Sequence, residues 1–148
     1  MAIIVTLCFI RDKNRLLLAL KKRGFGAGKW NGFGGKIGEH ETIEVSAIRE
    51  TKEECGIDIE KLEKRAVINF ILPKQQIECH VFEITKYSGE PIETEEMKPQ
   101  WFEIDKLPYE SMWSDDPIWL PLFLDNKKFK ARFIFDEHDQ VIDHEINF

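Results

Sequence analysis

The chain has 148 residues, of which 43% are hydrophobic, and this length suits one domain with a single core. The formal net charge is −6, which argues against a nucleic-acid polymer or an anionic membrane as the main partner. No run of 18 apolar residues is present, so the sequence predicts no membrane-spanning segment. The three cysteines are widely spaced and odd in number, which indicates reduced thiols and a cytoplasmic location.

The first third of the chain combines a hairpin pattern with a basic loop. Residues 3–10 and 15–21 are apolar runs separated by a turn-like segment, and this pattern predicts two paired strands. Six of the nine glycines follow between positions 24 and 35, where glycine permits positive φ and close approach of the backbone to a ligand. From Lys21 to Lys36 there are five basic residues and no acidic one. Such a stretch suits a short triphosphate, with a solvated loop as the alternative.

A helix is predicted for residues 42–55. Thr42 stands at its start, and Gly56 follows as a residue that ends a helix in the left-handed conformation. The apolar positions compatible with a buried stripe are Ile43, Ala47, Ile48 and Thr51.

The remainder of the chain alternates strand patterns with one short helix. The predicted strands are residues 65–72, 77–85, 100–104, 129–135 and 141–146, and the predicted helix is residues 117–124. Strands outnumber helices and the helices fall between them. The sequence therefore predicts an α+β fold, a single-domain α/β/α sandwich around a mixed β-sheet, over residues 1–148.

Three carboxylates lie at helical spacing in the predicted helix. Glu50, Glu53 and Glu54 stand at i, i+3 and i+4 and so share one face. A solvated face would place lysines at i+4 to relieve repulsion, whereas here Glu54 follows Glu50. Oxygen-only clusters suit Mg²⁺, with Mn²⁺ as the alternative. This pattern predicts a divalent-cation site for pyrophosphate chemistry.

The glycine-rich loop and the acidic helix together resemble the Nudix box of the Nudix hydrolase family. The matching positions are Gly35, Glu41, Arg49, Glu50, Glu53, Glu54, Gly56 and Ile57. One departure is Thr51, where the family usually has a bulky aliphatic residue packed on the sheet.

The resemblance implies roles for individual residues of this sequence. Glu53 and Glu54 are expected to bind metal, with Glu50 as a further ligand or as the residue that activates water, and the carbonyl of Gly35 completing the shell. Glu96 lies in an acidic loop from which, in the related oxidised-nucleotide hydrolases, a glutamate reaches the metals. Glu93 and Glu95 are alternatives for that part, and a solvated loop is the plain interpretation of all three. Arg49 and Glu41 are expected to pair in a supporting role.

Segments outside the box resemble those of the animal-type MutT homologues, the Nudix proteins that hydrolyse oxidised purine nucleoside triphosphates. These segments are residues 21–36 and 112–116, with Trp119 and residues 128–129. The resemblance implies a base pocket, and physical chemistry agrees with it. Two adjacent carboxyls in an apolar pocket share charge badly, so one pKa rises and that group can donate a hydrogen bond. Asp115 and Asp116 are therefore expected to read the Watson-Crick edge of the base, with Asn31 holding the far side or the sugar.

The same pocket needs walls and a floor. Aromatic stacking on a purine contributes about 1–3 kcal/mol per base. The residues expected to form the walls, or matched to pocket positions by the resemblance, are Phe25, Phe70, Met97, Trp113, Trp119, Thr6 and Lys21. For Phe33, Trp101, Phe123 and Phe133 we predict ordinary core positions instead. A competing interpretation of the acid pair makes Asp116 the N-terminal cap of the helix that contains Pro117.

The function predicted from these patterns is hydrolysis of oxidised purine (deoxy)nucleoside triphosphates such as 8-oxo-dGTP and 2-oxo-dATP to monophosphate and pyrophosphate, with Mg²⁺. The partner is then a small nucleotide, with no nucleic-acid polymer and no membrane, and a monomer is expected. One alternative is a Nudix pyrophosphatase for another nucleotide, dinucleoside polyphosphate or nucleotide sugar. Another is a non-catalytic Nudix module that senses a nucleotide, against which the intact glutamates argue.

Overall fold

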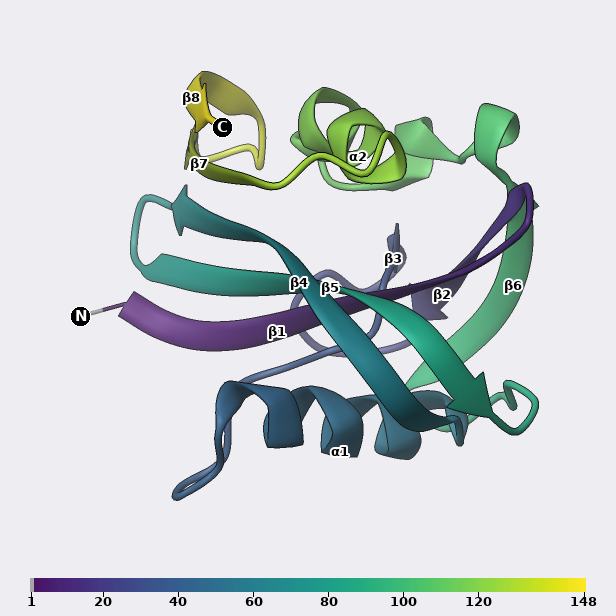
Figure 1. Cartoon of the computed structure of the whole chain (residues 1–148). Helices are drawn as coiled ribbons and strands as arrows, with labels where there is room; N and C mark the ends of the chain where they lie inside the picture. Colours follow the sequence, from purple (N-terminus) through teal and green to yellow (C-terminus); the bar gives the residue numbers. More distant parts are fainter. Residues whose placement is uncertain (1) are drawn as a thin grey trace.

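Eight strands form one mixed sheet in the computed structural model, which describes residues 2–148 (Figure 1). The strands are β1 (Ala2–Asp12), β2 (Arg15–Lys21), β3 (Trp30–Asn31), β4 (Asp58–Ile71), β5 (Gln76–Ser88), β6 (Met97–Glu103), β7 (Phe129–Phe135) and β8 (Val141–Asn147). Their order across the sheet is β3-β2-β1-β5-β4-β7-β8, and β6 pairs with β2. The β1–β5 and β4–β7 pairs are parallel, and the other pairs are antiparallel.

Strand β2 and the middle of β1 are apolar because both faces of the sheet are covered there. Phe9 and Leu18 pack into one core cluster, whereas their neighbours Cys8 and Leu17 pack into a second cluster on the opposite face. All four side chains are fully buried. A strand that is buried on both faces has no polar positions to alternate with, which explains the leucine-rich run of β2.

One helix covers each face of the sheet (Figure 1). Helix α1 (Ile43–Cys55) packs its Ala47 into the second cluster, and helix α2 (Asp116–Leu124) packs its Phe123 into the first. Two short 3₁₀ turns, Ile104–Lys106 and Tyr109–Ser111, lead into α2. Within residues 2–148, no helix is long and apolar enough to cross a membrane.

The local signals at the ends of α1 act as the sequence predicts. The Val45 N–H donates to the Thr42 side chain at 3.1 Å, which satisfies one of the free amide groups of the first turn. Gly56 follows the helix with φ at +80°, and its N–H donates to the carbonyl of Lys52 at 2.9 Å. Helix α1 therefore has fixed ends, which hold the glutamates between them in a defined register.

The predicted fold class, a mixed sheet between helices, is confirmed, but several element boundaries were wrong. Strand β4 begins at Asp58 rather than 65, because its charged first half still pairs with β5, with an irregular register. Strand β6 begins at Met97 rather than 100, and the two-residue β3 in the glycine-rich loop was missed. The buried face of α1 was also misplaced by one side chain. Ser46 is fully buried, whereas Ile48 is 37% exposed.

Candidate active site

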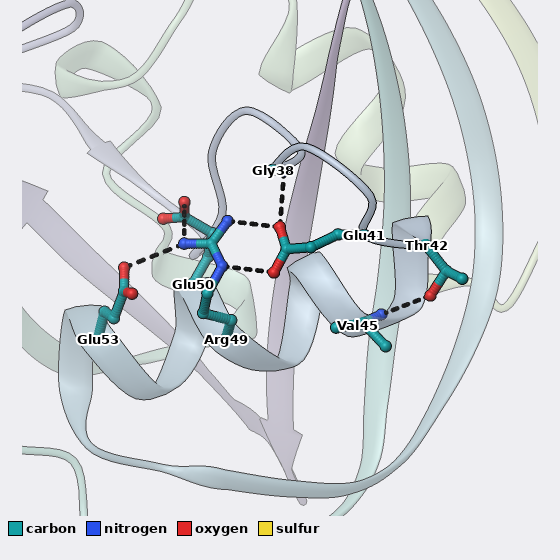
Figure 2. A network of polar contacts seen from close by, with 7 residues as sticks. All are labelled: Gly38, Glu41, Thr42, Val45, Arg49, Glu50 and Glu53. Carbon is teal, nitrogen blue, oxygen red and sulfur yellow. Dashed lines mark hydrogen bonds and ion pairs between the residues drawn. The ribbon is translucent and has the colours of Figure 1, made fainter.

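A network of ion pairs organises the acidic side of α1 around Arg49 (Figure 2). The guanidinium donates to both oxygens of Glu41, through Nε at 2.6 Å and Nη2 at 2.8 Å. Its Nη1 donates to Glu50 at 3.0 Å and to Glu53 at 3.2 Å. Glu41 also accepts the Gly38 N–H at 2.6 Å, and the Arg49 hydrogen bonds hold its pKa below the usual range. The Arg49 guanidinium thus joins the loop to the helix and offsets the repulsion among the glutamates.

Glu54 is the buried member of the three glutamates, with 7% of its surface exposed. Its Oε1 accepts the Gly34 N–H at 2.8 Å, so the glycine-rich loop lies directly on it. Gly34 is required there because a Cβ would lie 1.8 Å from the Thr6 carbonyl oxygen. Burial raises the pKa of Glu54 to about 8, and the neighbouring Glu50 charge adds to the rise. An ionised Glu54 is therefore costly unless a positive group neutralises it.

Gly35 lies against the carboxyl of Glu50. A Cβ on Gly35 would come within 2.8 Å of the Glu50 Cδ. The Gly35 carbonyl accepts the Thr6 N–H at 2.9 Å. Glu53, by contrast, points toward solvent with its side chain 58% exposed. Among the described residues 2–148, no group of three or more Asp, Glu, His or Cys side chains lies close enough together to bind a metal ion as the side chains stand. The helix offers oxygen donors that fit a hard divalent cation, with Arg49 holding two of the three carboxylates.

The acidic loop of residues 93–96 is held by the basic residues that follow β2. Glu96 accepts hydrogen bonds from Arg23, through Nη2 at 2.6 Å and Nε at 3.2 Å, and these bonds lower its pKa. Lys22 pairs with Glu93, and Arg23 lies 3.8 Å from Glu95. All three candidate glutamates of this loop are therefore paired with basic side chains. Glu96 is nonetheless close enough to Glu54 for its charge to contribute to the raised pKa of that carboxyl.

A cavity of about 210 Å³ opens on the face of the sheet that α2 covers, and the ten residues predicted to bind substrate all line it. They are Thr6, Lys21, Phe25, Asn31, Phe70, Met97, Trp113, Asp115, Asp116 and Trp119. They come from five strands, the glycine-rich loop, the segment that leads into α2, and α2 itself. Gly34 and Gly35 also line the cavity, so it is continuous with the loop that contacts Glu54 and Glu50.

The acid pair forms the polar end of this cavity. Asp115 and Asp116 are each 3% exposed, and the Trp119 Nε1–H donates to Asp115 Oδ2 at 2.6 Å. For Asp116 Oδ2, the structure of residues 2–148 supplies no hydrogen-bond partner. Burial raises the pKa of Asp115 to about 6, and burial together with the Asp115 charge raises that of Asp116 well above its usual value. Burial therefore favours the protonated form of Asp116, and its Oδ2 has capacity for a hydrogen bond to a ligand.

The capping interpretation of Asp116 was wrong. Asp116 is the first residue of α2, and the cap position belongs to Asp115, whose side chain makes no capping hydrogen bond. The Asp115 carbonyl accepts the N–H groups of Ile118 and Trp119 instead. Because neither carboxyl caps the helix, both are directed to the cavity and its floor.

Aromatic rings and one lysine form the outer wall. Phe25, which is 55% exposed, stacks on Trp113 with ring centroids 5.1 Å apart. Gly26 has φ at +84°, and a Cβ there would lie 3.3 Å from the indole. Lys29 Nζ lies 5.2 Å from the Trp113 ring centroid, a cation–π contact. The glycine-rich loop thus holds Trp113 from several sides.

Several lining residues were missed by sequence reasoning. Lys29, Leu72, Cys79 and Phe135 border the cavity. The three apolar residues are indistinguishable from core residues in a sequence, and Lys29 is one of several basic residues in its loop. Trp119 was predicted to bind substrate, but it is fully buried and contributes mainly through its hydrogen bond to Asp115. The residues predicted to be core, Phe33, Phe123 and Phe133, are fully buried, and Trp101 is half-buried against the second cluster.

Comparison with known proteins follows this geometry. Residues 1–123 match the NUDIX domain family. The chain belongs to the Nudix family. The chain is 47% identical over 146 residues to the oxidized purine nucleoside triphosphate hydrolase of Danio rerio, covering 97% of this chain and 94% of that protein. The protein of the same name from Mus musculus is 43% identical over 143 residues, covering 95% and 92%.

The Nudix fold is also evident from solved structures. The crystal structure of the mutator MutT protein from Bacillus halodurans superposes with a TM-score of 0.87, covering 98% of this chain and 97% of that one. Its sequence identity is 23%, so this likeness speaks for the fold alone. Nudix hydrolases generally use divalent metal ions, which agrees with the oxygen donors on α1.

Proposed function

We propose that this Nudix protein hydrolyses oxidised purine nucleoside triphosphates to the monophosphate and pyrophosphate. The observation that supports it most is one cavity lined by a buried acid pair and by the glycine-rich loop, whose Gly34 also contacts Glu54 of the acidic helix. The relatives from Danio rerio and Mus musculus carry names for this activity and match nearly the whole chain.

The base is read by Asp115 and Asp116. An oxidised guanine presents N–H donors at N1, N2 and N7 and a carbonyl at C6. Neutral Asp116 donates a hydrogen bond to an acceptor and accepts one from a donor, and the Trp119 N–H holds Asp115 in place. Asn31, on the short strand β3, serves the opposite edge or the sugar, with its Oδ1 fixed by the Gly32 N–H at 2.8 Å. Phe25, Phe70 and Trp113 stack on or border the purine.

The triphosphate extends from the cavity toward α1. Lys21 marks the path, because it lines the cavity and its charge lowers the pKa of both Glu54 and Glu96. Glu50, Glu53, Glu54, Glu96 and the carbonyl of Gly35 are the candidate ligands of Mg²⁺, with Mn²⁺ as the alternative. When bound, the cation supplies charge neutralisation on the phosphate oxygens and orientation of the attacking water.

The protein's own groups complete the reaction. A carboxylate, either Glu50 or Glu96, accepts the proton of a water that attacks phosphorus, and the anhydride P–O bond breaks to release pyrophosphate. Arg49 and Glu41 keep α1 in register with the glycine-rich loop during this step. We further propose that the protein acts in the cytoplasm as a monomer.

A panel of triphosphates tests the proposal. Purified protein with Mg²⁺ is incubated with 8-oxo-dGTP, 2-oxo-dATP, dGTP, dATP, a dinucleoside polyphosphate and a nucleotide sugar, and the products are separated by ion-exchange chromatography. We expect monophosphate and pyrophosphate from the oxidised purines, with the highest kcat/KM among the substrates. Faster turnover of the unmodified nucleotides or of the nucleotide sugar would reject the proposal.

A further inference from the structure

The end of α1 and the acidic loop meet at a threonine to which the sequence patterns assign no role. The last carbonyl groups of a helix have no partner within it. Here they are satisfied by the loop, since the Ile92 N–H donates to the Cys55 carbonyl at 2.9 Å and Thr94 Oγ1–H donates to the Glu54 carbonyl at 2.9 Å. The loop therefore docks on the very turn that carries Glu54.

Thr94 also sets the conformation of its own loop. Its Oγ1 accepts the N–H groups of Glu96 and Met97, each at 3.2 Å, and its backbone N–H donates to the Met97 carbonyl at 2.9 Å. One hydroxyl thus uses its donor on the acidic helix and its lone pairs on the two residues that follow. Glu96 and Met97 are placed by the same atom that contacts the backbone of Glu54.

The two placed residues belong to different parts of the site. Met97 is 4% exposed and lines the base cavity, whereas Glu96 is a candidate metal ligand paired with Arg23. Lys22, directly after β2, also fixes the position of this loop. Its Nζ donates to the Thr94 carbonyl at 2.7 Å, and its backbone N–H donates to the Glu96 carbonyl at 2.9 Å.

We propose that Thr94 is a positioning residue that couples the metal-binding carboxylates of α1 to the wall of the base cavity. The Thr94 hydroxyl fixes the spacing between Glu54 on one side and Glu96 and Met97 on the other. Loss of the hydroxyl frees the loop from the helix, so that cation binding and base discrimination weaken together. This inference rests on the function proposed above, and its test includes a measurement that needs no substrate.

The test compares Thr94→Val, which keeps the shape and removes the hydroxyl, with Thr94→Ser, which keeps the hydroxyl. Thr85→Val is the matched control, because the exposed Thr85 donates a hydroxyl to the Lys61 carbonyl at 3.4 Å, between β5 and β4. Mn²⁺ affinity is measured by electron paramagnetic resonance without nucleotide. We expect Thr94→Val to weaken Mn²⁺ binding by about 10-fold, the scale of a lost supporting hydrogen bond at a metal site.

Base selectivity supplies the second measurement. The ratio of kcat/KM for 8-oxo-dGTP over dGTP is expected to fall in Thr94→Val and to recover in Thr94→Ser, with Thr85→Val unchanged. A lower Tm in Thr94→Val with wild-type Mn²⁺ affinity and wild-type selectivity would overturn the inference and leave Thr94 a merely structural residue.

The wild-type protein gives a test that does not depend on any variant. If the coupling exists, Mn²⁺ slows hydrogen exchange of the Glu96 and Met97 amides, and exchange that Mn²⁺ leaves unchanged contradicts it. Failure of the proposed function is a separate outcome, in which the wild type binds Mn²⁺ but does not prefer oxidised purine triphosphates. In that case the Mn²⁺ affinities of the Thr94 variants still decide the inference.

Discussion

The chain holds two groups of carboxylates in different surroundings, on opposite faces of the sheet. On α1, Arg49 forms ion pairs with Glu50 and Glu53, and the Glu53 side chain also faces solvent. At the start of α2, Asp115 and Asp116 are buried without any cation, and a tryptophan N–H is their side-chain donor. Arg49 offsets the charge of the first group, although burial raises the pKa of its buried member Glu54 to about 8. In the second group, burial without a cation favours the protonated form. Under the function proposed above, the first group serves phosphate chemistry and the second serves recognition of a base.

The largest expected effect comes from removing charge where charge is needed. Glu54→Gln keeps the shape of the side chain but removes a buried candidate metal ligand. We expect kcat for 8-oxo-dGTP to fall by about 10³-fold, within the range for loss of a catalytic carboxylate, with the fold retained by circular dichroism. Glu60→Gln, at an exposed position of β4, is the control and should match the wild type. Near wild-type turnover of Glu54→Gln would reject its assignment as a metal ligand.

The reverse experiment changes the neutral pair. Asp116→Asn prevents the carboxyl from exchanging donor and acceptor roles, so kcat/KM for 8-oxo-dGTP should fall by roughly 10- to 100-fold, the cost of one unsatisfied buried polar contact. Turnover of dGTP should change much less, which would reduce the selectivity. Asp125→Asn, beyond the end of α2, serves as the control. If selectivity stays intact, the base is read elsewhere.

The aromatic wall contributes binding rather than chemistry. Trp113→Leu removes the ring that stacks on Phe25 and bears the Lys29 contact. We expect KM for 8-oxo-dGTP to rise by about 5- to 100-fold, corresponding to 1–3 kcal/mol of stacking, with kcat little changed. Trp101→Leu, on the opposite face, tests whether any tryptophan loss has this effect. A fall in kcat at constant KM would contradict the stacking role.

The smallest effect is the pH dependence of stability that the acid pair contributes. Because burial raises the pKa of Asp115 to about 6 and that of Asp116 further, the folded state binds more protons than the unfolded state. Their contribution is complete below the ordinary Asp pKa and is lost as pH rises through the folded-state values. Wild-type Tm should therefore fall between pH 5 and pH 8 by more than that of Asp116→Asn. Parallel Tm profiles from differential scanning calorimetry would show that the pair is already ionised.

Sequence patterns predict this protein well where the signal comes from a few consecutive residues. The spacing of Glu50, Glu53 and Glu54, the Thr42 cap and the Gly56 stop all depend on a few consecutive residues, and the helix they predict is present. The pocket residues were predicted through the resemblance to the animal-type MutT homologues, and they line one cavity although they lie between positions 6 and 119. Strand ends were less predictable, because the charged first half of β4 is fixed by its pairing with β5.

The sequence by itself determined the helix with its carboxylates, the glycine-rich loop before it and the two-faced apolar strands, because these follow from side-chain periodicity and backbone preference. Only the tertiary structure decided which carboxylates are buried, which are held by a cation and which lack a partner. Those properties depend on neighbours far along the chain, such as Gly34 at Glu54, Arg23 at Glu96, and Thr94 at the end of α1. Desolvation and hydrogen bonding are set by packing in three dimensions, and no pattern of nearby residues contains that information.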